Sequence, residues 1–234
     1  GIIVMRALLL AAGLGTRLRP LTNTIPKCLV PIKGKPLLDI WLETLTRASV
    51  GPFLINTHYL AEDVEAYVKA SRYRDSVSLV HEPELCGTAG TLIANLGFFQ
   101  AKDGLLIHAD NYCTADFRAF VQAHQERPPE CLMSMMTFRT DNPAMCGIVE
   151  IDTHGVVVGF HEKVAAPPGN LANGAIYLLS PDLICLLRTE FVGVKDFSTE
   201  VLPRLVGQVY SHETDRVLLD IGTPRRYERV NDAL

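Results

Sequence analysis

The sequence has no excess of positive charge and no long apolar run. Its 22 Lys and Arg residues are outnumbered by 26 Asp and Glu residues, which gives a formal net charge of -4. Composition therefore provides no general attraction to nucleic acid or to an anionic membrane. No apolar stretch approaches the roughly 18 residues that a membrane-spanning helix needs. We expect neither a nucleic acid nor a membrane partner.

Cysteine motifs and nucleophile motifs are absent as well. The six cysteines form no C-x-x-C pair and have no neighbouring histidines at zinc spacing. We expect reduced thiols in a cytoplasmic protein. No Ser or Cys stands in a recognisable nucleophile motif with a His partner. A composition of 48% hydrophobic and 21% charged residues is ordinary for a globular protein, and any phosphate ligand must be held by local charge.

Strand-like apolar runs alternate with helical patterns over the first 140 residues. This alternation predicts an α/β fold, in which a Rossmann-like, mostly parallel central sheet is flanked by helices. The predicted strands are 6–12, 53–56, 77–81, 105–110 and 132–138, and the predicted helices are 37–48, 61–69, 91–99 and 116–127. We take Pro36 as the first helical position of the helix that it precedes.

The pattern changes after Thr140 to shorter strand candidates. These predict a small appended β region with a hairpin turn at 152–155. The strands expected there are 147–151, 156–160 and 175–179, followed by helices at 181–187 and 198–206. One more apolar strand ends at Asp220, and a helix is expected from 224 to 233.

The stretch from residue 8 to residue 20 is typical of an anion site. Glycines let backbone N–H groups approach a phosphate closely, and cations supply charge that a neutral loop lacks. The P-loop sequence is absent, and Leu18 stands where a dinucleotide fingerprint needs its third glycine. The residues concerned are Gly13, Gly15, Arg17, Arg19 and, further on, Lys27.

Taken with Pro26-Lys27 and Gly34-Lys35-Pro36, this stretch resembles the signature of the sugar-phosphate nucleotidyltransferases, also called nucleotide-sugar pyrophosphorylases. Their pattern is close to L-A-[AG]-G-x-G-[ST]-R-[LM]-x-P-L-T, followed by P-K-x-[LM]-x-P and G-K-P. The resemblance implies the nucleotide-diphospho-sugar transferase fold as a single domain over 1–234. Residues up to about 140 would form the nucleotide-binding half, and about 141–234 the sugar-phosphate-binding half.

A second loop extends the resemblance. Glu82, Leu85 and the run 87–90 match E-x-x-x-L-G-T-A-G, with Cys86 as an extra residue or a shifted register. From the residues alone, Gly87 also fits a plain turn at a helix start. The nucleotide-binding residues that the resemblance implies are Leu10, Ala12, Gly13, Gly15, Thr16, Glu82, Gly87 and Thr88.

Two aspartates are candidate metal ligands. Asp110 ends an apolar strand where the family has G-D-[NVT], and Asp220 matches the family's D-x-G-T-P. Taken singly, an Asp after a strand also fits a helix cap. Because both follow apolar strands, a parallel sheet could bring them to one edge, where two carboxylates and phosphate oxygens suit Mg²⁺. The resemblance implies that both bind this ion.

The sugar side is represented by Phe160-His161-Glu162-Lys163, which corresponds to F-x-E-K. In the family this Glu contacts sugar hydroxyls and this Lys the sugar phosphate; without the resemblance they would read as a solvated pair. The segment 173–177 resembles N-A-G-I-Y, but its Gly and Ala are exchanged. The implied sugar-phosphate-binding residues are Asn111, Gly147, Glu162, Lys163 and Asn173.

The implied reaction is attack by a sugar 1-phosphate oxygen on the α-phosphorus of a nucleoside triphosphate, which releases pyrophosphate. Because the nucleophile is already anionic, catalysis rests on positioning and charge neutralisation, and Arg17 and Lys27 are the expected catalytic residues. GTP with a mannose- or heptose-like sugar is favoured. Uridylyl, thymidylyl or cytidylyl transfer to another sugar, such as N-acetylmuramate 1-phosphate, remains open.

Two further alternatives remain. One is a choline-phosphate-type cytidylyltransferase, which shares the N-terminal signature, although the sugar motifs favour a sugar. The other is a non-catalytic nucleotide-sugar sensor, against which the presence of both cations and both aspartates argues. We expect a monomer or a homodimer.

Overall fold

The structure is a computed structural model that describes residues 5–216 and 218–233. The chain divides into two compact units that interleave along the sequence. The first unit contains the described residues of 1–85, 107–114 and 217–234, and the second contains 86–106 and 115–216. Among the helices of the described residues, none is long and apolar enough to cross a membrane.

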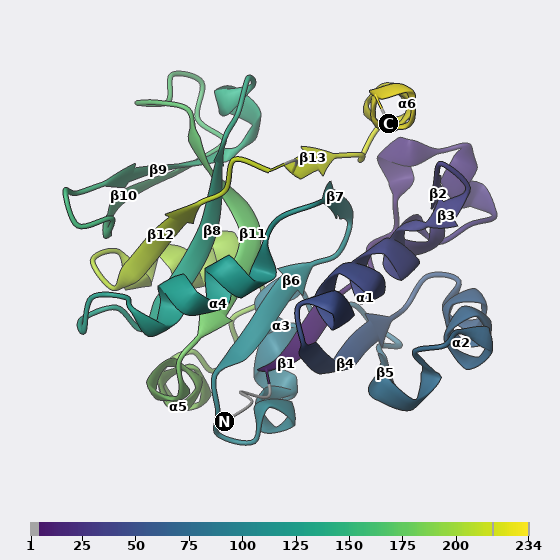
Figure 1. Ribbon diagram of the computed structural model, residues 1–234, viewed down its shortest axis with the longest axis horizontal. Coiled ribbons are helices and arrows are strands. Elements are labelled where there is room, and N and C mark those ends of the chain that lie inside the picture. Colours follow the sequence, from purple (N-terminus) through teal and green to yellow (C-terminus); the bar gives the residue numbers. More distant parts are fainter. Residues whose placement is uncertain (1–4, 217, 234) are drawn as a thin grey trace. The chain divides into compact units, whose positions relative to one another are not determined.

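The first unit is built on a parallel sheet. Strand β1 (Met5–Leu10) pairs in parallel with β4 (Val50–Thr57), which pairs in parallel with β5 (Val77–His81). These three strands lie side by side in Figure 1, and the last two residues of β6 (Gly104–His108) also belong to this unit. The near-continuous apolar sequence of β1 places its residues 7–9 in the core, with no exposed surface. The predicted α/β fold with a mainly parallel sheet is confirmed.

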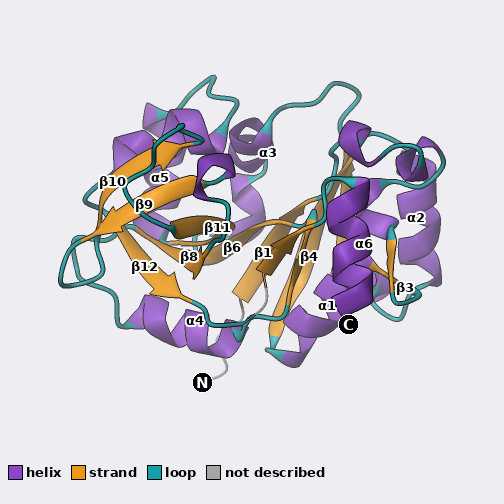
Figure 2. Cartoon of the chain, turned by 90° about the horizontal axis from the view of Figure 1, so that it is seen from above, coloured by secondary structure: helices purple, strands orange, loops and turns teal. Residues whose placement is uncertain are grey.

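Two amphipathic helices cover this sheet. Helix α1 (Leu37–Arg47) packs on β4 and α2 (Ala61–Ala70) packs on β5 (Figure 2). Pro36 precedes α1 with extended backbone, so the prediction that it is the first helical residue was wrong by one position. The core face of α1 consists of the side chains of Leu37, Leu38, Trp41, Leu42 and Leu45.

The end of the chain returns to the first unit. Strand β13 (Leu218–Asp220) pairs antiparallel with β7 (Asn111–Cys113), and helix α6 (Pro224–Ala233) follows. The expectation that a parallel sheet aligns Asp110 with Asp220 was wrong. Asp220 lies opposite Asn111 in a two-stranded antiparallel ribbon, because the chain arrives from the opposite direction.

Helix α6 is fixed to a small hairpin of β2 (Pro31–Ile32) and β3 (Lys35–Pro36). The Tyr227 hydroxyl donates to the Pro31 carbonyl oxygen. The Lys33 backbone N–H donates to Asn231 Oδ1 at 2.8 Å. Residues almost 200 positions apart are therefore held side by side, which fixes the approach of β13.

The second unit is a mostly antiparallel sheet covered by helices. Its strand order is β10-β9-β11-β6, and β8 joins β11 to β12. The strands are β8 (Met133–Arg139), β9 (Gly147–Ile151), β10 (Val157–Glu162), β11 (Leu171–Leu179) and β12 (Val209–Glu213). The helices are α3 (Thr88–Ala94), α4 (Phe117–Gln125) and α5 (Pro181–Glu190).

Several boundaries in this unit differ from the prediction. Strand β12 was not predicted, and β11 begins at Leu171 rather than at 175. The helix expected at 91–99 is α3 plus a separate 3₁₀ turn, Leu96–Phe99. The helix expected at 198–206 is a π-helical turn, Phe197–Val201, continued by the 3₁₀ turn Leu202–Leu205. Pro203 cannot donate an N–H, which favours a break in the regular α-helix there.

The indole of Trp41 links α1 to the β7–β13 ribbon. Its side chain is 2% exposed, and Nε1 donates to the Asn111 carbonyl oxygen at 2.9 Å. We expect Trp41→Phe to lower the free energy of unfolding by about 1 to 3 kcal/mol, because the partly buried Asn111 carbonyl loses its donor and the core loses some side-chain volume. Urea unfolding followed by circular dichroism measures this, since the variant lacks the chain's one Trp as a fluorescence probe. An unchanged midpoint would show that the bond contributes nothing.

Candidate active site

The glycine-rich loop follows β1 in the first unit. Gly15 has a left-handed φ of 63°, and a β-carbon there would lie 2.9 Å from Thr22 Cγ2. The Thr22 hydroxyl donates to the Gly15 carbonyl oxygen at 2.5 Å. Gly13, in contrast, is exposed and has nothing within 4 Å of where its β-carbon would be. The fold itself therefore requires Gly15, whereas Gly13 leaves the loop backbone open to a ligand.

The neighbouring predicted nucleotide-binding residues differ in exposure. Leu10 and Ala12 are buried, at 8% and 6% exposed, whereas Thr16 and Arg17 are exposed. Leu10 also accepts a backbone hydrogen bond from Ala109 N–H at 3.0 Å. The exposed residues are free to reach a ligand with their side chains, and the buried pair can offer only backbone.

Glu82 lies inside the first unit and supports this loop. Its carboxylate accepts a hydrogen bond from Asn56 Nδ2 at 3.1 Å, and Asn56 Oδ1 accepts from the Ala11 backbone N–H at 2.8 Å. Both side chains are 5% exposed. Glu82 was predicted to bind the nucleotide. In the structure its carboxylate contacts Asn56, and Asn56 in turn contacts the loop backbone, so Glu82 orients Asn56.

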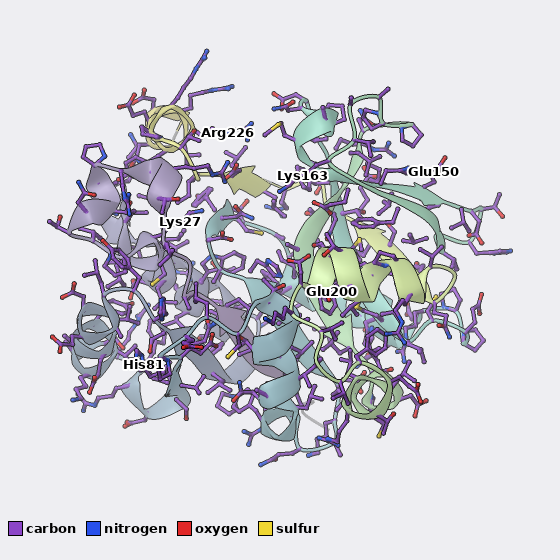
Figure 3. All side chains as sticks on the ribbon, turned by 180° about the vertical axis from the view of Figure 1, so that it is seen from behind. Lys27, His81, Glu150, Lys163, Glu200 and Arg226 are labelled. Carbon is purple, nitrogen blue, oxygen red and sulfur yellow. The ribbon has the colours of Figure 1, made fainter. Side chains whose placement is uncertain are left out.

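Lys27 and Asp110 form a partly buried ion pair. Lys27 lies in the 3₁₀ turn Lys27–Leu29 (Figure 3), and its Nζ is 3.3 Å from Asp110 Oδ2. The lysine side chain is 10% exposed and the aspartate side chain 47%. Burial raises the pKa of Asp110, but the charges of Lys27 and His108 outweigh this effect, so the pKa lies below its ordinary value. Asp110 is therefore an anion that faces a cation.

Three charged groups meet at the turn after β13. A β-carbon on Gly222 would lie 2.8 Å from Asp220 Oδ1, 3.0 Å from Arg17 Nη2 and 3.5 Å from Lys27 Nζ. The Gly222 N–H donates to Asp220 Oδ1 at 2.6 Å. The structure thus brings Asp220 together with Arg17 and Lys27, which lie about 200 positions earlier in the chain.

The donor set at this turn suits Mg²⁺ better than a softer ion. Asp110 and Asp220 offer hard carboxylate oxygens, and Gly222 has no side chain that would lie against Asp220. Within residues 5–216 and 218–233, no group of three or more His, Cys, Asp or Glu gathers as a complete metal set. A metal here would draw its remaining ligands from water or phosphate, as Mg²⁺ commonly does.

Lys35 of the Gly34-Lys35-Pro36 motif points elsewhere. Its ammonium forms ion pairs with Glu43 and, at 3.7 Å, with Asp39, both on α1. Glu43 also pairs with Arg47 at 2.6 Å. This lysine therefore fastens the β2–β3 hairpin to α1 in the structure.

The predicted sugar-side residues, apart from Asn111 in the first unit, lie in the second unit. Glu162 pairs with Gly147 across β10 and β9, and a β-carbon on Gly147 would lie 2.9 Å from Glu162 Oε2. Burial raises the pKa of Glu162; Lys163 lowers it and Asp196 raises it further. Lys163 is exposed with a left-handed φ of 51°, and its N–H donates to the Cys146 carbonyl oxygen at 3.1 Å.

Asn173 is held in place by its own strand. Its Nδ2 donates to the Tyr177 hydroxyl at 2.7 Å, and its Oδ1 accepts from the Ala175 N–H at 2.8 Å. The pairing of β11 with β8 slips between Asn173 and Tyr177, and Ala175 adopts a left-handed φ of 56°. Ala175 therefore occupies the position that the glycine of N-A-G-I-Y would hold.

Gly87 and Thr88 fasten a second loop of the same unit. Ala89 N–H donates to the Lys195 carbonyl oxygen at 2.8 Å, and Phe197 N–H donates to Thr88 Oγ1 at 2.8 Å. A β-carbon on Gly87, whose φ is 84°, would lie 2.4 Å from that same Lys195 oxygen. Gly87 thus permits close contact between two backbones, in addition to any contact with a ligand.

A comparison with protein families now decides the relationship. A family model described as nucleotidyl transferase matches residues 6–234. The chain belongs to this family. The resemblance inferred from the sequence motifs is thereby confirmed.

Curated relatives of this nucleotidyl transferase carry a narrower description. This chain is 32% identical over 230 residues to the mannose-1-phosphate guanylyltransferase catalytic subunit beta of Drosophila pseudoobscura pseudoobscura. The match covers 95% of this chain and 60% of the relative. The protein of the same name from Danio rerio is 31% identical, covering 95% and 62% respectively. The chain thus spans about 60% of the length of these relatives.

A solved structure covers this nucleotidyl transferase more completely. The crystal structure of HddC from Yersinia pseudotuberculosis has a TM-score of 0.83 at 25% identity, covering 98% of this chain and 99% of that one. A second structure of HddC is complexed with GMP-PN and has a TM-score of 0.82, with the same identity and coverage. The fold of the nucleotidyl transferase is therefore shared over almost its whole length.

The sequence reasoning did not single out two residues that the structure connects to this site. Asn56 bridges the glycine loop and Glu82, and Arg226 Nη1 lies 3.3 Å from Asp220 Oδ2. Asn56 is the second-last residue of the apolar strand β4, and polar residues near the carboxyl end of such a strand are a signal that could have identified it. Arg226 carries no comparable signal, because its partner becomes apparent only when α6 has packed.

The left-handed backbone of Ala175 predicts an unusual response to substitution. We expect Ala175→Gly to raise the free energy of unfolding by up to about 1 kcal/mol, because glycine removes the steric cost of a positive φ. Ala172→Gly, in the same strand and fully buried, is the matched control and should lower it by about 1 kcal/mol. Chemical denaturation of both variants tests the opposite signs. Equal losses in the two would contradict strain at Ala175.

Proposed function

We propose that this chain transfers a nucleotidyl group from GTP to a mannose- or heptose-like sugar 1-phosphate, forming a nucleotide sugar and pyrophosphate. Family membership supports nucleotidyl transfer. The names of the relatives support guanylyl transfer to a mannose phosphate, and the GMP-PN complex of HddC supports a guanine nucleotide. The heptose-like alternative comes from the sequence motifs.

The observation that carries the proposal is the set of charges around Gly222. Arg17 and Lys27 supply two cations within 3.5 Å of one point, and Asp220 supplies a carboxylate oxygen at 2.8 Å from it. Asp110 is tied to the same lysine. Cations beside paired carboxylates suit a polyphosphate with a divalent metal, and a purely structural turn has no need of them.

In the proposed reaction, an oxygen of the sugar 1-phosphate forms a bond to the α-phosphorus. The bond from the α-phosphorus to the bridging oxygen of the β-phosphate breaks, and both electrons leave with pyrophosphate. No proton must be removed from the nucleophile, so no general base is required. Arg17 neutralises the charge that accumulates on the α-phosphate, and its exposed position allows it to reach there.

Lys27 binds the phosphates by exchanging partners. Its ammonium is already desolvated against Asp110, so contact with a phosphate costs little further loss of hydration. Asp110 and Asp220 would hold Mg²⁺, which when bound neutralises phosphate charge and orients the leaving group. The exposed backbone at Gly13, and the Gly15 turn beside it, line the nucleotide.

On the acceptor side, Glu162 binds sugar hydroxyls and Lys163 binds the sugar phosphate. The half-buried Glu162 is fixed over Gly147, so its carboxylate is presented in one orientation. Asn173, fixed by Tyr177, contributes its remaining amide hydrogen-bonding capacity to the sugar.

A substrate panel tests the function. Pyrophosphate release should be measured with each of four nucleoside triphosphates against mannose 1-phosphate, a heptose 1-phosphate, glucose 1-phosphate and N-acetylmuramate 1-phosphate, with Mg²⁺ present. We expect GTP with mannose or heptose phosphate to give the highest kcat/KM. A preference for UTP, TTP or CTP would overturn the choice of base. No release from any pair would overturn catalysis and favour a nucleotide-sugar sensor.

Removal of the charge of Arg17 or of Lys27 should slow the reaction of the substrate pair that has the highest kcat/KM. We expect Arg17→Ala or Lys27→Ala to lower kcat by about 100-fold, the scale for loss of one preorganised charge donor. Lys69→Ala removes a surface cation of α2 and should leave kcat unchanged. Because Lys27 is buried, the thermal unfolding of Lys27→Ala and of Lys27→Arg must also be measured, to separate a loss of catalysis from a loss of folding. Unchanged kcat in Arg17→Ala would contradict its role.

A further inference from the structure

Both oxygens of Asp220 already have partners in the structure. Oδ1 accepts the Gly222 N–H at 2.6 Å, and Oδ2 accepts Arg226 Nη1 at 3.3 Å. The two charged side chains are each 37% exposed, so water and ions can reach the pair. A metal that binds Asp220 must therefore compete with the guanidinium of Arg226.

The position of Arg226 is unfavourable for its own helix. Thr223 precedes the first residue of α6, Pro224, and Arg226 lies in the first turn, where its N–H donates to Thr223 Oγ1 at 3.3 Å. The N-terminal turn of a helix carries partial positive charge and favours acidic side chains, but α6 has none there. A cation at this position weakens the helix locally, and Asp220 is the group that offsets it.

Arg226 completes a repeated arrangement. Each candidate metal ligand has one cation at 3.3 Å, Lys27 for Asp110 and Arg226 for Asp220. Arg17 lies beside the same Gly222 turn. If the two carboxylates hold a divalent ion, its charge would weaken their attraction for Lys27 and Arg226, and the phosphates that accompany the ion would offer these two cations new partners.

We propose that Arg226 is a counter-ion of Asp220 that leaves this carboxylate when the divalent ion binds, and that it then contacts the phosphates of the nucleotide and of the pyrophosphate product. This proposal deepens the proposed function and rests on it. Arg226 is then a binding residue for the polyphosphate, and it pairs with Asp220 until substrate binds.

Two binding measurements test the exchange without any turnover. Mn²⁺ replaces Mg²⁺ because its binding to the ligand-free chain can be followed by electron paramagnetic resonance. We expect Arg226→Gln to bind Mn²⁺ about two- to fivefold more tightly than the native chain, since a half-exposed ion pair no longer competes. Arg229→Gln is the matched control, because this arginine is exposed on the same helix and its change removes the same charge.

Inorganic pyrophosphate is the second probe, measured by calorimetry at saturating Mg²⁺. We expect Arg226→Gln to weaken its binding about tenfold, the scale for one lost charge-assisted hydrogen bond. Arg226→Lys keeps the charge and should recover part of the affinity. Thermal unfolding is measured for each variant. If Arg226→Gln fails to fold, the Mn²⁺ and pyrophosphate affinities of Arg226→Lys decide the question instead.

The opposite signs are the test. Tighter Mn²⁺ with weaker pyrophosphate in Arg226→Gln, but not in Arg229→Gln, supports the exchange. An unchanged Mn²⁺ affinity, or pyrophosphate binding equal to that of the native chain, overturns it. Failure of the substrate panel would overturn the proposed function instead, and these two affinities would still decide whether Arg226 exchanges partners.

Discussion

Charge compensation at the two aspartates is the constraint on which this site depends. A lysine as buried as Lys27 is costly unless an anion faces it, and Asp110 is that anion. Arg226 stands in the same relation to Asp220. The ligand-free site is therefore stable because its cations and carboxylates satisfy one another. In the proposed reaction, phosphates would replace the carboxylates as partners of the cations, and a divalent ion would replace the cations as partner of the carboxylates.

Glycine provides the second constraint, through contacts that a side chain would prevent. A β-carbon on Gly222 would enter the charged cluster, and one on Gly147 would meet the Glu162 carboxylate. One on Gly87 would clash with the Lys195 backbone. These three glycines therefore each allow a close contact within the chain. Where an alanine takes such a place, at Ala175, the backbone keeps the left-handed conformation and carries the strain.

The elements with strong periodicity could be predicted, and those decided by pairing could not. The apolar strand β1 and the amphipathic α1 stood close to their predicted bounds, because burial dictates their residue pattern locally. Strand β12 was missed: its sequence carries no clear alternation, and it becomes a strand by adding in parallel to β8. The ribbon of β13 and β7 joins residues more than 100 positions apart, which no local pattern specifies.

By itself, the sequence determined the family, the alternation of strands and helices, and the residue types of the candidate anion and metal site, because glycines, cations and carboxylates at fixed spacings can be recognised without a structure. Tertiary structure alone decided which of them meet. It placed Asp220 beside Arg17 and Lys27 through an antiparallel ribbon, set Glu82 behind Asn56, and turned Lys35 toward α1. The reason is physical: ion pairs and hydrogen bonds depend on separations in space, which are fixed only when the core has packed.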